Sequence, residues 1–313
     1  MKCPQQMHSD ILSGVTVFER GWLSSNNILI RAALGEAGAV LVDTGHLNHA
    51  AQTLSLVRAG LAGRPLKGVV NTHLHSDHCG GNALLQHAFG MPITVPPGQA
   101  DAVRVWDEAL LGHAEIGQHI ERFSISHVLA PGEVMLAGGR EWQVVAAPGH
   151  DPHSVMLFDA AQGVLISADA LWENGFGVVF PELVGEPGFD DVGATLDSIA
   201  ALPVRLVIPG HGAPFTDVAA ALARARSRLA AFKADPAKHD RHAVKVLIKY
   251  HLMEERVQAL SDLLRWVCAA PMLAAVLQRG SAPATPPQWA EQLVRELISS
   301  GALAIKDGVV VDV

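Results

Sequence analysis

The stretch 71–82, NTHLHSDHCGGN, gathers three histidines and an aspartate within six positions. His73 and His75 are two residues apart and follow an apolar stretch, so extended backbone would point both side chains to the same face. Asp77 and His78 follow where the chain turns toward a helix, and two glycines allow a tight backbone there. One loop can therefore present ligands to two metal ions. Imidazole and carboxylate groups together suit zinc, and also iron or manganese.

Three more polar residues stand where apolar stretches end. His150 follows EWQVVAAPG, Asp169 follows GVLISA, and His211 follows VRLVIPG. In an open α/β sheet, sites are built at the ends of the strands, where loops bring distant residues together. We therefore expect these three residues to join the histidine-rich loop in one two-metal site.

The elements that must position these residues alternate along the first two-thirds of the chain. Short Val/Ile/Leu stretches read as buried strands, and a helix stands between the first two. Alternation of this kind indicates a layered α/β fold. The strands are expected at 38–45, 67–73, 91–96, 141–150, 163–170 and 204–211, with helices at 50–61 and within 98–124.

The pattern changes near residue 220 from alternating strands to helices. Helical spacing of apolar residues is expected at 217–234, 242–255, 256–269 and 286–301. The tail, ALAIKDGVVVDV, predicts two short strands around an Asp307-Gly308 turn. We expect a catalytic domain at 1–234 and a mostly helical, winged-helix-like domain at 235–313. Its eight basic and eight acidic residues from position 240 onward favour packing or homodimer formation over binding of nucleic acid.

Composition and charge narrow the protein class. With 313 residues, 49% of them hydrophobic, the chain can bury a large core. Its net charge of −8 argues against a general nucleic-acid binder. Three scattered cysteines give no disulfide framework, the first ten residues show no secretory signal, and no apolar run spans a membrane. We expect a cytoplasmic protein.

One segment departs from this acidic balance. The stretch 224–249 holds eight basic and two acidic residues, a net charge of +6, whereas the rest of the chain carries −14. It is either a solvated helix face or a docking surface for an anionic substrate. In the second case Arg224, Arg228 and Lys249 are the candidate contacts.

The ligand pattern H-x-H-x-D-H, followed by a distant His, Asp and His, resembles that of the metallo-β-lactamase-fold hydrolases over about residues 14–230. The resemblance implies a four-layer αββα sandwich. It places His73, His75 and His150 at one metal, and Asp77, His78 and His211 at the other, with Asp169 bridging. It also implies that Asp43, in the stretch VDTG, steadies the ligand loop.

The resemblance further implies a mechanism and a branch. Two divalent ions, zinc being favoured over iron or manganese, would share a hydroxide, and Asp77 would orient this nucleophile and carry protons. An aspartate at 169, rather than a cysteine, resembles the glyoxalase-II-like, lactonase, phosphodiesterase and ribonuclease branches. Cys79 is expected to be structural. The C-terminal unit resembles that of a subgroup related to glyoxalase II.

The function expected from these features is binuclear hydrolysis of a small ester, thioester or lactone. Three alternatives stay open: a phosphodiesterase or endoribonuclease using the same site, a mononuclear iron persulfide dioxygenase, and a binding protein on a retired hydrolase scaffold. Trp22, Trp172, Phe176 and Phe180 could wall the substrate pocket, or could simply be packing residues. The remaining histidines, including His113, His239 and His251, are expected at the surface or on helices.

Overall fold

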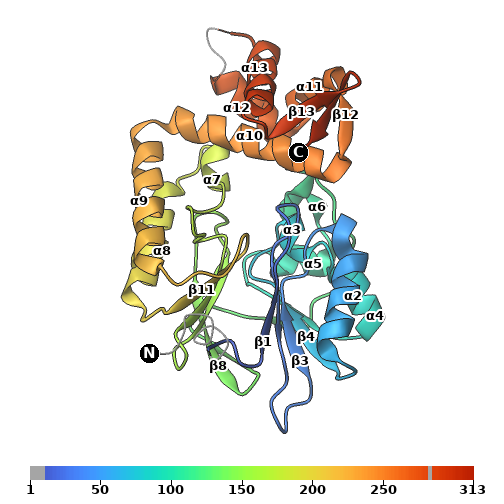
Figure 1. Cartoon of the computed structure of the whole chain (residues 1–313), viewed down its shortest axis with the longest axis vertical. Helices are drawn as coiled ribbons and strands as arrows, with labels where there is room; N and C mark the ends of the chain where they lie inside the picture. Colours follow the sequence, from blue (N-terminus) through green and yellow to red (C-terminus); the bar gives the residue numbers. More distant parts are fainter. Residues whose placement is uncertain (1–10, 281–283) are drawn as a thin grey trace.

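The computed structural model describes residues 11–280 and 284–313. The N-terminal segment 1–10, in which we expect no secretory signal, lies outside the described residues. Two mixed sheets, the helices that cover them and a C-terminal unit make up the described chain (Figure 1).

The first sheet has six strands in the order of the sequence. They are β1 (Val15–Phe18), β2 (Asn27–Ile30), β3 (Ala39–Val42), β4 (Leu66–Val70), β5 (Ile93–Val95) and β6 (His127–Val128). Strands β1 to β3 pair antiparallel, and β3 to β6 pair parallel. Every residue of β3 is buried, as its unbroken apolar run AVLV requires of a strand covered on both faces.

The second sheet has five strands in the order β11-β10-β9-β8-β7. They are β7 (Val134–Ala137), β8 (Arg140–Ala146), β9 (Val155–Asp159), β10 (Val164–Ala168) and β11 (Leu206–Pro209). Neighbours pair antiparallel except β10 and β11, which are parallel. The parallel pair needs a long crossover, and helix α8 (Phe189–Ala201) lies within it.

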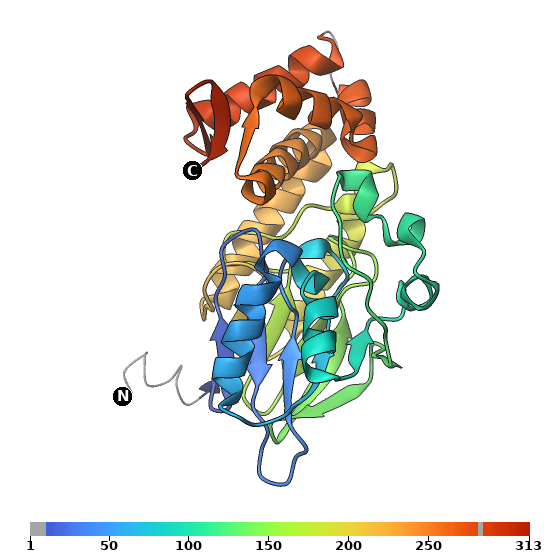
Figure 2. The ribbon, with the colours of Figure 1, turned by 90° about the vertical axis from the view of Figure 1, so that its right-hand side faces the viewer.

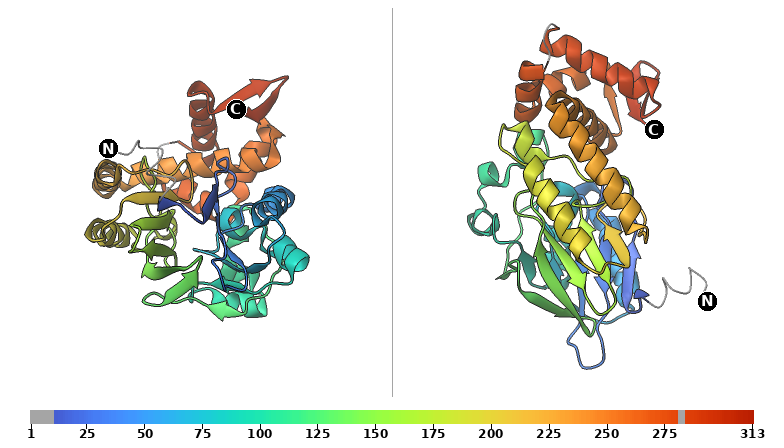
Figure 3. Two further views of the ribbon diagram at one scale, coloured as in Figure 1. Left: turned by 60° about the horizontal axis from the view of Figure 1, so that its bottom comes forward. Right: turned by 90° about the vertical axis from the view of Figure 1, so that its left-hand side faces the viewer.

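Helices cover the outer face of each sheet. Helices and helical turns before the C-terminal unit are η1 (Leu47–His49), α2 (Ala50–Leu61), α3 (Ser76–Cys79), α4 (Asn82–Phe89), α5 (Ala100–Val105), α6 (Glu108–Leu111), η2 (His113–Ile116), α7 (Phe180–Leu183), α8 (Phe189–Ala201) and α9 (Val218–Ala234). The buried residues of α2 recur as a single stripe along the helix, which fits one covered face. Helices α2 and α4 lie outside the first sheet, and α8 and α9 outside the second (Figure 3).

Three apolar cores hold these layers together. One lies between the sheets and includes Val42, Leu157 and Ile166. The other two lie between each sheet and its own helices. This is the four-layer αββα sandwich expected from the sequence, and that prediction is confirmed.

The C-terminal unit stacks on one end of the sandwich (Figure 2). Its elements are α10 (Pro236–Glu255), β12 (Val257–Ala259), α11 (Leu260–Ala269), α12 (Pro271–Gly280), α13 (Pro286–Ser299), β13 (Leu303–Lys306) and β14 (Val309–Asp312). The strands form an antiparallel sheet in the order β12-β14-β13. The expected hairpin is present, and Asp307 and Gly308 both adopt positive φ, as a tight two-residue turn requires.

This unit has its own apolar core, built from α10 to α13. Ile116, Val178 and Leu183 of the sandwich join that core, so the two parts are packed together. The division expected after residue 234 falls between α9 and α10, and the assignment of two domains stays a prediction. In the described part of the chain no single helix is long and apolar enough to cross a membrane, and α11 with α12 pass that test only as a pair bent by 87°.

Candidate metal centre

The predicted ligands meet at one edge of the sandwich because each follows the end of a strand. His73 and His75 lie in the loop after β4, and Asp77 and His78 lie in the short helix α3. The remaining three come from the second sheet, after β8, β10 and β11 respectively: His150, Asp169 and His211. Packing the sheets face to face brings the two groups together.

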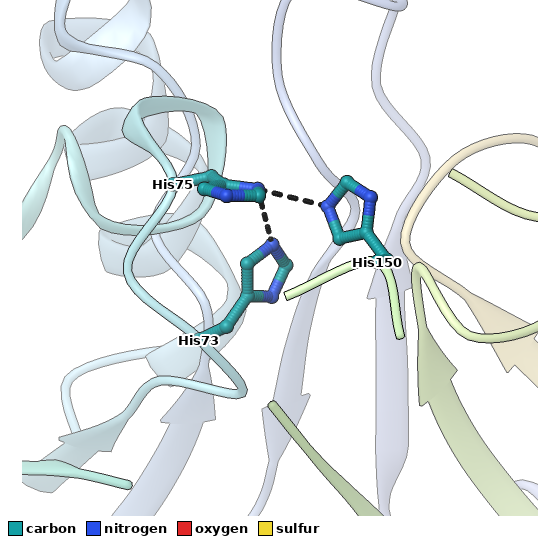
Figure 4. Close-up of side chains that lie close together, drawn as sticks. All are labelled: His73, His75 and His150. Carbon is teal, nitrogen blue, oxygen red and sulfur yellow. Dashed lines mark hydrogen bonds between the residues drawn. The ribbon is translucent and has the colours of Figure 1, made fainter. Parts of the chain in front are cut away.

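The first cluster contains three histidines (Figure 4). His75 Nδ1 lies 3.1 Å from His73 Nε2 and 2.8 Å from His150 Nε2. His150 Nδ1 donates to the Val178 carbonyl at 2.6 Å, which leaves Nε2 without a proton in the neutral ring. Three convergent imidazole nitrogens of this kind can ligate one cation.

The second cluster contains Asp77, His78, Asp169 and His211, all buried, with ligand atoms within 4.8 Å of one another. His211 Nε2 lies 2.9 Å from Asp77 Oδ2. Asp169 faces both clusters, since Oδ1 is 3.4 Å from His78 Nε2 and Oδ2 is 3.4 Å from His150 Nε2. Asp169 therefore stands between the two clusters and could offer one oxygen to each.

The backbone around the clusters is shaped for close approach. A Cβ at Gly210 would lie 2.1 Å from Asp169 Oδ1, and a Cβ at Gly177 would lie 2.3 Å from His150 Nδ1. Only glycine fits at both positions. Asp43, which accepts a hydrogen bond from the ligand loop, and Ala168, which precedes Asp169, adopt φ of 58° and 46°. Such left-handed conformations cost energy in non-glycine residues and are concentrated at functional sites.

Asp43 touches the ligand loop at three points. Its Oδ1 accepts from the Thr72 amide at 2.9 Å, and its Oδ2 accepts from the Thr72 hydroxyl at 2.8 Å. The same Oδ2 lies 2.8 Å from His78 Nδ1. Nδ1 therefore carries the proton, and Nε2 faces the second cluster as a free ligand atom.

The electrostatics of the second cluster favour a bound cation. His78 Nε2 is buried and makes no hydrogen bond to any described residue. Burial alone would lower the pKa of His78, but the surrounding carboxylates, Asp77 first, raise it well above its usual range. Burial alone would raise the pKa of Asp77, but His78 and His211 lower it to about 2. A divalent metal ion would supply the positive charge that these groups otherwise draw from a proton.

In the first cluster, the surroundings of the histidines disfavour their protonation. Burial, followed by the neighbouring histidines, lowers the pKa of His73 and of His75 well below the usual range. Both rings are therefore neutral at pH 7 and offer lone pairs. The donor set of both clusters fits divalent metal ions.

A sequence model described as Metallo-beta-lactamase superfamily matches residues 20–211, which is more than half of the chain and includes all seven predicted ligands. The chain belongs to the metallo-β-lactamase superfamily. Among curated members, the hydroxyacylglutathione hydrolase of Dechloromonas aromatica (strain RCB) is 33% identical over 165 residues, which are 53% of this chain and 50% of that protein. The Rhodobacter capsulatus hydroxyacylglutathione hydrolase is 32% identical over 47% of this chain and 48% of its own length. The chain thus spans about half the length of these relatives.

Solved structures of the superfamily agree with the fold. The metallo-beta-lactamase family protein TTHA1429 from Thermus thermophilus aligns with a TM-score of 0.58 over 97% of this chain and 100% of its own, at 20% identity. TTHA1623, solved in a di-iron-bound form, is 28% identical, with a TM-score of 0.52 over 66% of this chain and 96% of its own. The resemblance to the glyoxalase-II-like branch of the superfamily is confirmed by the curated relatives.

A cavity of about 600 Å³ opens onto the two clusters of candidate metal ligands. All four predicted aromatic residues line it: Trp22, Trp172, Phe176 and Phe180. Trp22 is 57% exposed and stacks on His211 at 5.3 Å, so its other face is free for a substrate. Trp172 Nε1 donates to Asp169 Oδ1 at 3.2 Å. Phe176 is buried and mainly packs the wall from behind, against Phe232.

The three residues predicted to contact an anion differ in their surroundings. Arg228 lines the cavity, and no described carboxylate lies within ion-pair distance of it. Lys249 also lines the cavity, but its ammonium group pairs with Asp312 and donates to the Ala302 carbonyl at 2.6 Å. Arg224 donates to the Glu173 carbonyl at 2.7 Å and does not line the cavity.

The basic side chains of the stretch 224–249 do not form one unpaired surface, and a docking role for an anionic substrate stays a prediction. Most of its basic side chains pair with carboxylates from other segments or from the same helix turn. The pairs are Arg226–Asp197, Lys233–Asp190, Lys238–Asp235, Arg241–Glu296, Lys245–Glu296 and Lys249–Asp312. Four carboxylates from outside the stretch therefore offset part of its +6 charge: Asp190, Asp197, Glu296 and Asp312.

Sequence reasoning missed several residues around the ligands. His113, expected at the surface or on a helix, lies in η2, where it is buried and donates through Nε2 to the Leu74 carbonyl, between two ligands, at 2.7 Å. His239 and His251 are buried as well. Asp151 Oδ2 lies 3.8 Å from His75 Nε2, on the side of the ring away from the cluster. The sequence offered one signal for Asp151, namely its place next to His150 in the stretch GHD.

Proposed function

We propose that this protein is a metal-dependent hydrolase of a small thioester and that its seven clustered donors hold two divalent metal ions. The observation that carries the proposal is the convergence of those donors into two adjoining clusters at the wall of one cavity. Support for a thioester, rather than another ester or a lactone, comes from the curated relatives named hydroxyacylglutathione hydrolase.

The three-histidine cluster would hold one ion and the four-residue cluster the other, with Asp169 facing both. When bound, such ions polarise a carbonyl oxygen and lower the pKa of water to about 7. Zinc suits the histidine-rich donor set. Iron is the main competitor, because the related TTHA1623 was solved with two irons.

The chain's own groups prepare the attack. Asp77 is ionised at neutral pH, so its carboxylate can accept a proton and orient a nucleophile. Trp172 holds the Asp169 carboxylate in place through its indole N–H. Trp22, stacked on His211, shields one side of the site from water.

The cavity fits a small molecule with an apolar part and an anionic part. Helix α10 supplies one wall, including Val246, Leu247 and Met253, and Arg228 stands beside them without a carboxylate partner. The winged-helix-like C-terminal unit would then serve as a pocket wall. Its basic groups are mostly paired, which does not favour the phosphodiesterase or endoribonuclease alternative. The four-donor second cluster does not favour a mononuclear dioxygenase.

The test is a substrate panel on protein loaded with zinc, iron or manganese, with the bound metal counted by elemental analysis. The panel contains lactoylglutathione, a homoserine lactone, nitrocefin and bis-p-nitrophenyl phosphate. We expect about two ions per chain and the highest kcat/KM on the thioester. Fastest turnover of the phosphodiester, or metal content that never exceeds one ion per chain at saturation, would contradict the proposal.

A further inference from the structure

The two ligand clusters lie at one end of the sandwich. Helix α10 lies across that end and reaches over both sheets (Figure 1, Figure 3). It follows residue 211, so it lies beyond the segment that the superfamily model matches. Two of its side chains, His239 and Tyr250, contact the segments that carry the ligands. They are eleven residues apart, or just over three helical turns, so they lie on one face about 16 Å apart along the axis.

Tyr250 reaches the loop that carries His75 and Asp77. Its hydroxyl lies 3.2 Å from the hydroxyl of Ser76, the residue between those two ligands. The Ser76 hydroxyl donates in turn to Gln118 Oε1 at 2.6 Å, so the single phenolic proton of Tyr250 is shared between Ser76 Oγ and the Leu23 carbonyl. The phenol is also 3.4 Å from the Leu23 carbonyl, and burial keeps it protonated by raising the pKa of Tyr250 well above its usual range.

His239 reaches the segment behind His150. Its Nε2 accepts from the Val179 amide at 3.1 Å. The neighbouring Val178 carbonyl is the acceptor for His150 Nδ1 at 2.6 Å, and the Phe180 amide donates to the His150 carbonyl at 3.2 Å. Burial lowers the pKa of His239 to about 4, so the ring is neutral and able to accept.

The helix itself is anchored. The Asp240 carboxylate accepts two hydrogen bonds from Arg279 at 2.9 and 2.6 Å, and Lys249 is tied to the C-terminal strand β14 through Asp312. A helix held at both ends transmits position along its length, since a helical segment is stiff compared with a loop. Each ligand-bearing segment therefore rests on the same rigid element.

We propose that α10 braces the metal centre, with Tyr250 and His239 as positioning residues for the two ligand-bearing segments. The inference rests on the metal binding of the proposed function. The two residues act through Ser76 and the Val178–Val179 segment. Their loss should therefore lower the affinity for metal more than it lowers the stability of the fold.

The test is a double-mutant cycle on the full-length protein with Zn²⁺ alone as the probe. Affinity is measured by competition with a chromophoric chelator, and thermal unfolding is followed in excess chelator. Tyr250→Phe, which keeps the ring packed against His46, should weaken Zn²⁺ binding by about tenfold, at the lower end for groups that orient ligands. In a Ser76→Ala background the same change should have much less effect, because the contact is already lost.

His239→Ala should weaken Zn²⁺ binding by about tenfold, and His239→Gln, which keeps an acceptor, should restore most of it. Lys238→Ala, next to His239, and Glu255→Ala, at the end of the same helix, change exposed residues; these control variants should stay within about twofold of wild type. If Tyr250→Phe and His239→Ala shift only the metal-free melting temperature and leave Zn²⁺ affinity unchanged, α10 is a packing helix and the proposal is overturned.

The readout separates this inference from the proposed substrate. A wild-type protein that binds two Zn²⁺ ions but cleaves no thioester overturns the substrate assignment, and the cycle still decides on the brace. Additive effects of Tyr250→Phe and Ser76→Ala on Zn²⁺ affinity overturn the stated route through Ser76. A wild-type protein that binds no divalent metal overturns both proposals.

Discussion

Asp43→Asn should change which nitrogen of His78 carries the proton. The Thr72 amide must donate to position 43, so the asparagine oxygen would take the place of Oδ1. The side-chain amide nitrogen would then occupy the place of Oδ2 and face His78 Nδ1 at 2.8 Å. To accept from that amide, His78 would carry its proton on Nε2, the atom that faces the second cluster. Asparagine tolerates the positive φ of this position, so the backbone is not strained further.

The magnitude follows from the bond that is lost. A hydrogen bond to a charged group contributes about 1.5–3 kcal/mol. Converted at about 1.4 kcal/mol per factor of ten, this weakens metal binding at the second cluster by about 10- to 100-fold, the range found for groups that orient metal ligands. The three-histidine cluster does not contact Asp43, so one ion per chain should stay tightly bound.

The assay is competition with a chromophoric chelator, which resolves the two binding steps, with elemental analysis of the dialysed protein. Asp159→Asn is a matched control. Asp159 is also a buried aspartate with a cationic partner, Arg140, but it pairs with Val164 at the opposite end of β10 from Asp169. The control should lower stability without changing either metal affinity. Equal loss at both steps, or no loss at either in Asp43→Asn, would refute the tautomer argument.

Three further outcomes are expected. Asp77→Asn should keep the fold but lower kcat by about 100-fold or more, since a proton acceptor is lost; unchanged turnover at equal metal content would remove Asp77 from the chemistry. Arg228→Glu should raise KM for an anionic thioester at nearly constant kcat and less so at high salt, while Arg224→Glu, off the cavity, should have little effect; equal responses in the two variants would contradict the cavity assignment. Burial, then Glu255, raises the pKa of Glu254 to about 7, so the folded state favours the protonated acid. That stabilisation is complete below about pH 4.5 and is lost as pH rises through 7. Chemical denaturation should therefore show that the free energy of unfolding of wild type falls by about 1 kcal/mol more than that of Glu254→Gln between about pH 5 and pH 8. Parallel pH curves for the two proteins would show that Glu254 does not titrate in this way.

The fold could be predicted from the sequence because its signals are local. The run AVLV became the buried strand β3, and the helix expected at 50–61 is α2 with those bounds. Strands β1, β2, β6, β7, β9 and β12 were not predicted, and β12 lies in the stretch 256–269 that we expected to be helical throughout. Most of them are only two to five residues long, so each carries little of the local pattern that marks a strand.

The sequence by itself determined the chemistry that is available: seven imidazole and carboxylate groups, each placed where an apolar strand must end. Tertiary structure alone decided how they are used. Whether His78 offers Nε2 depends on Asp43, which follows strand β3, and the position of Ser76 depends on Tyr250, 174 residues further along the chain. Tertiary structure also gave part of the basic stretch its carboxylate partners, as where Arg241 meets Glu296 across 55 residues. Residue types and spacing fix what a segment can donate or accept, but the partner is chosen only when packing brings distant segments within a few ångströms.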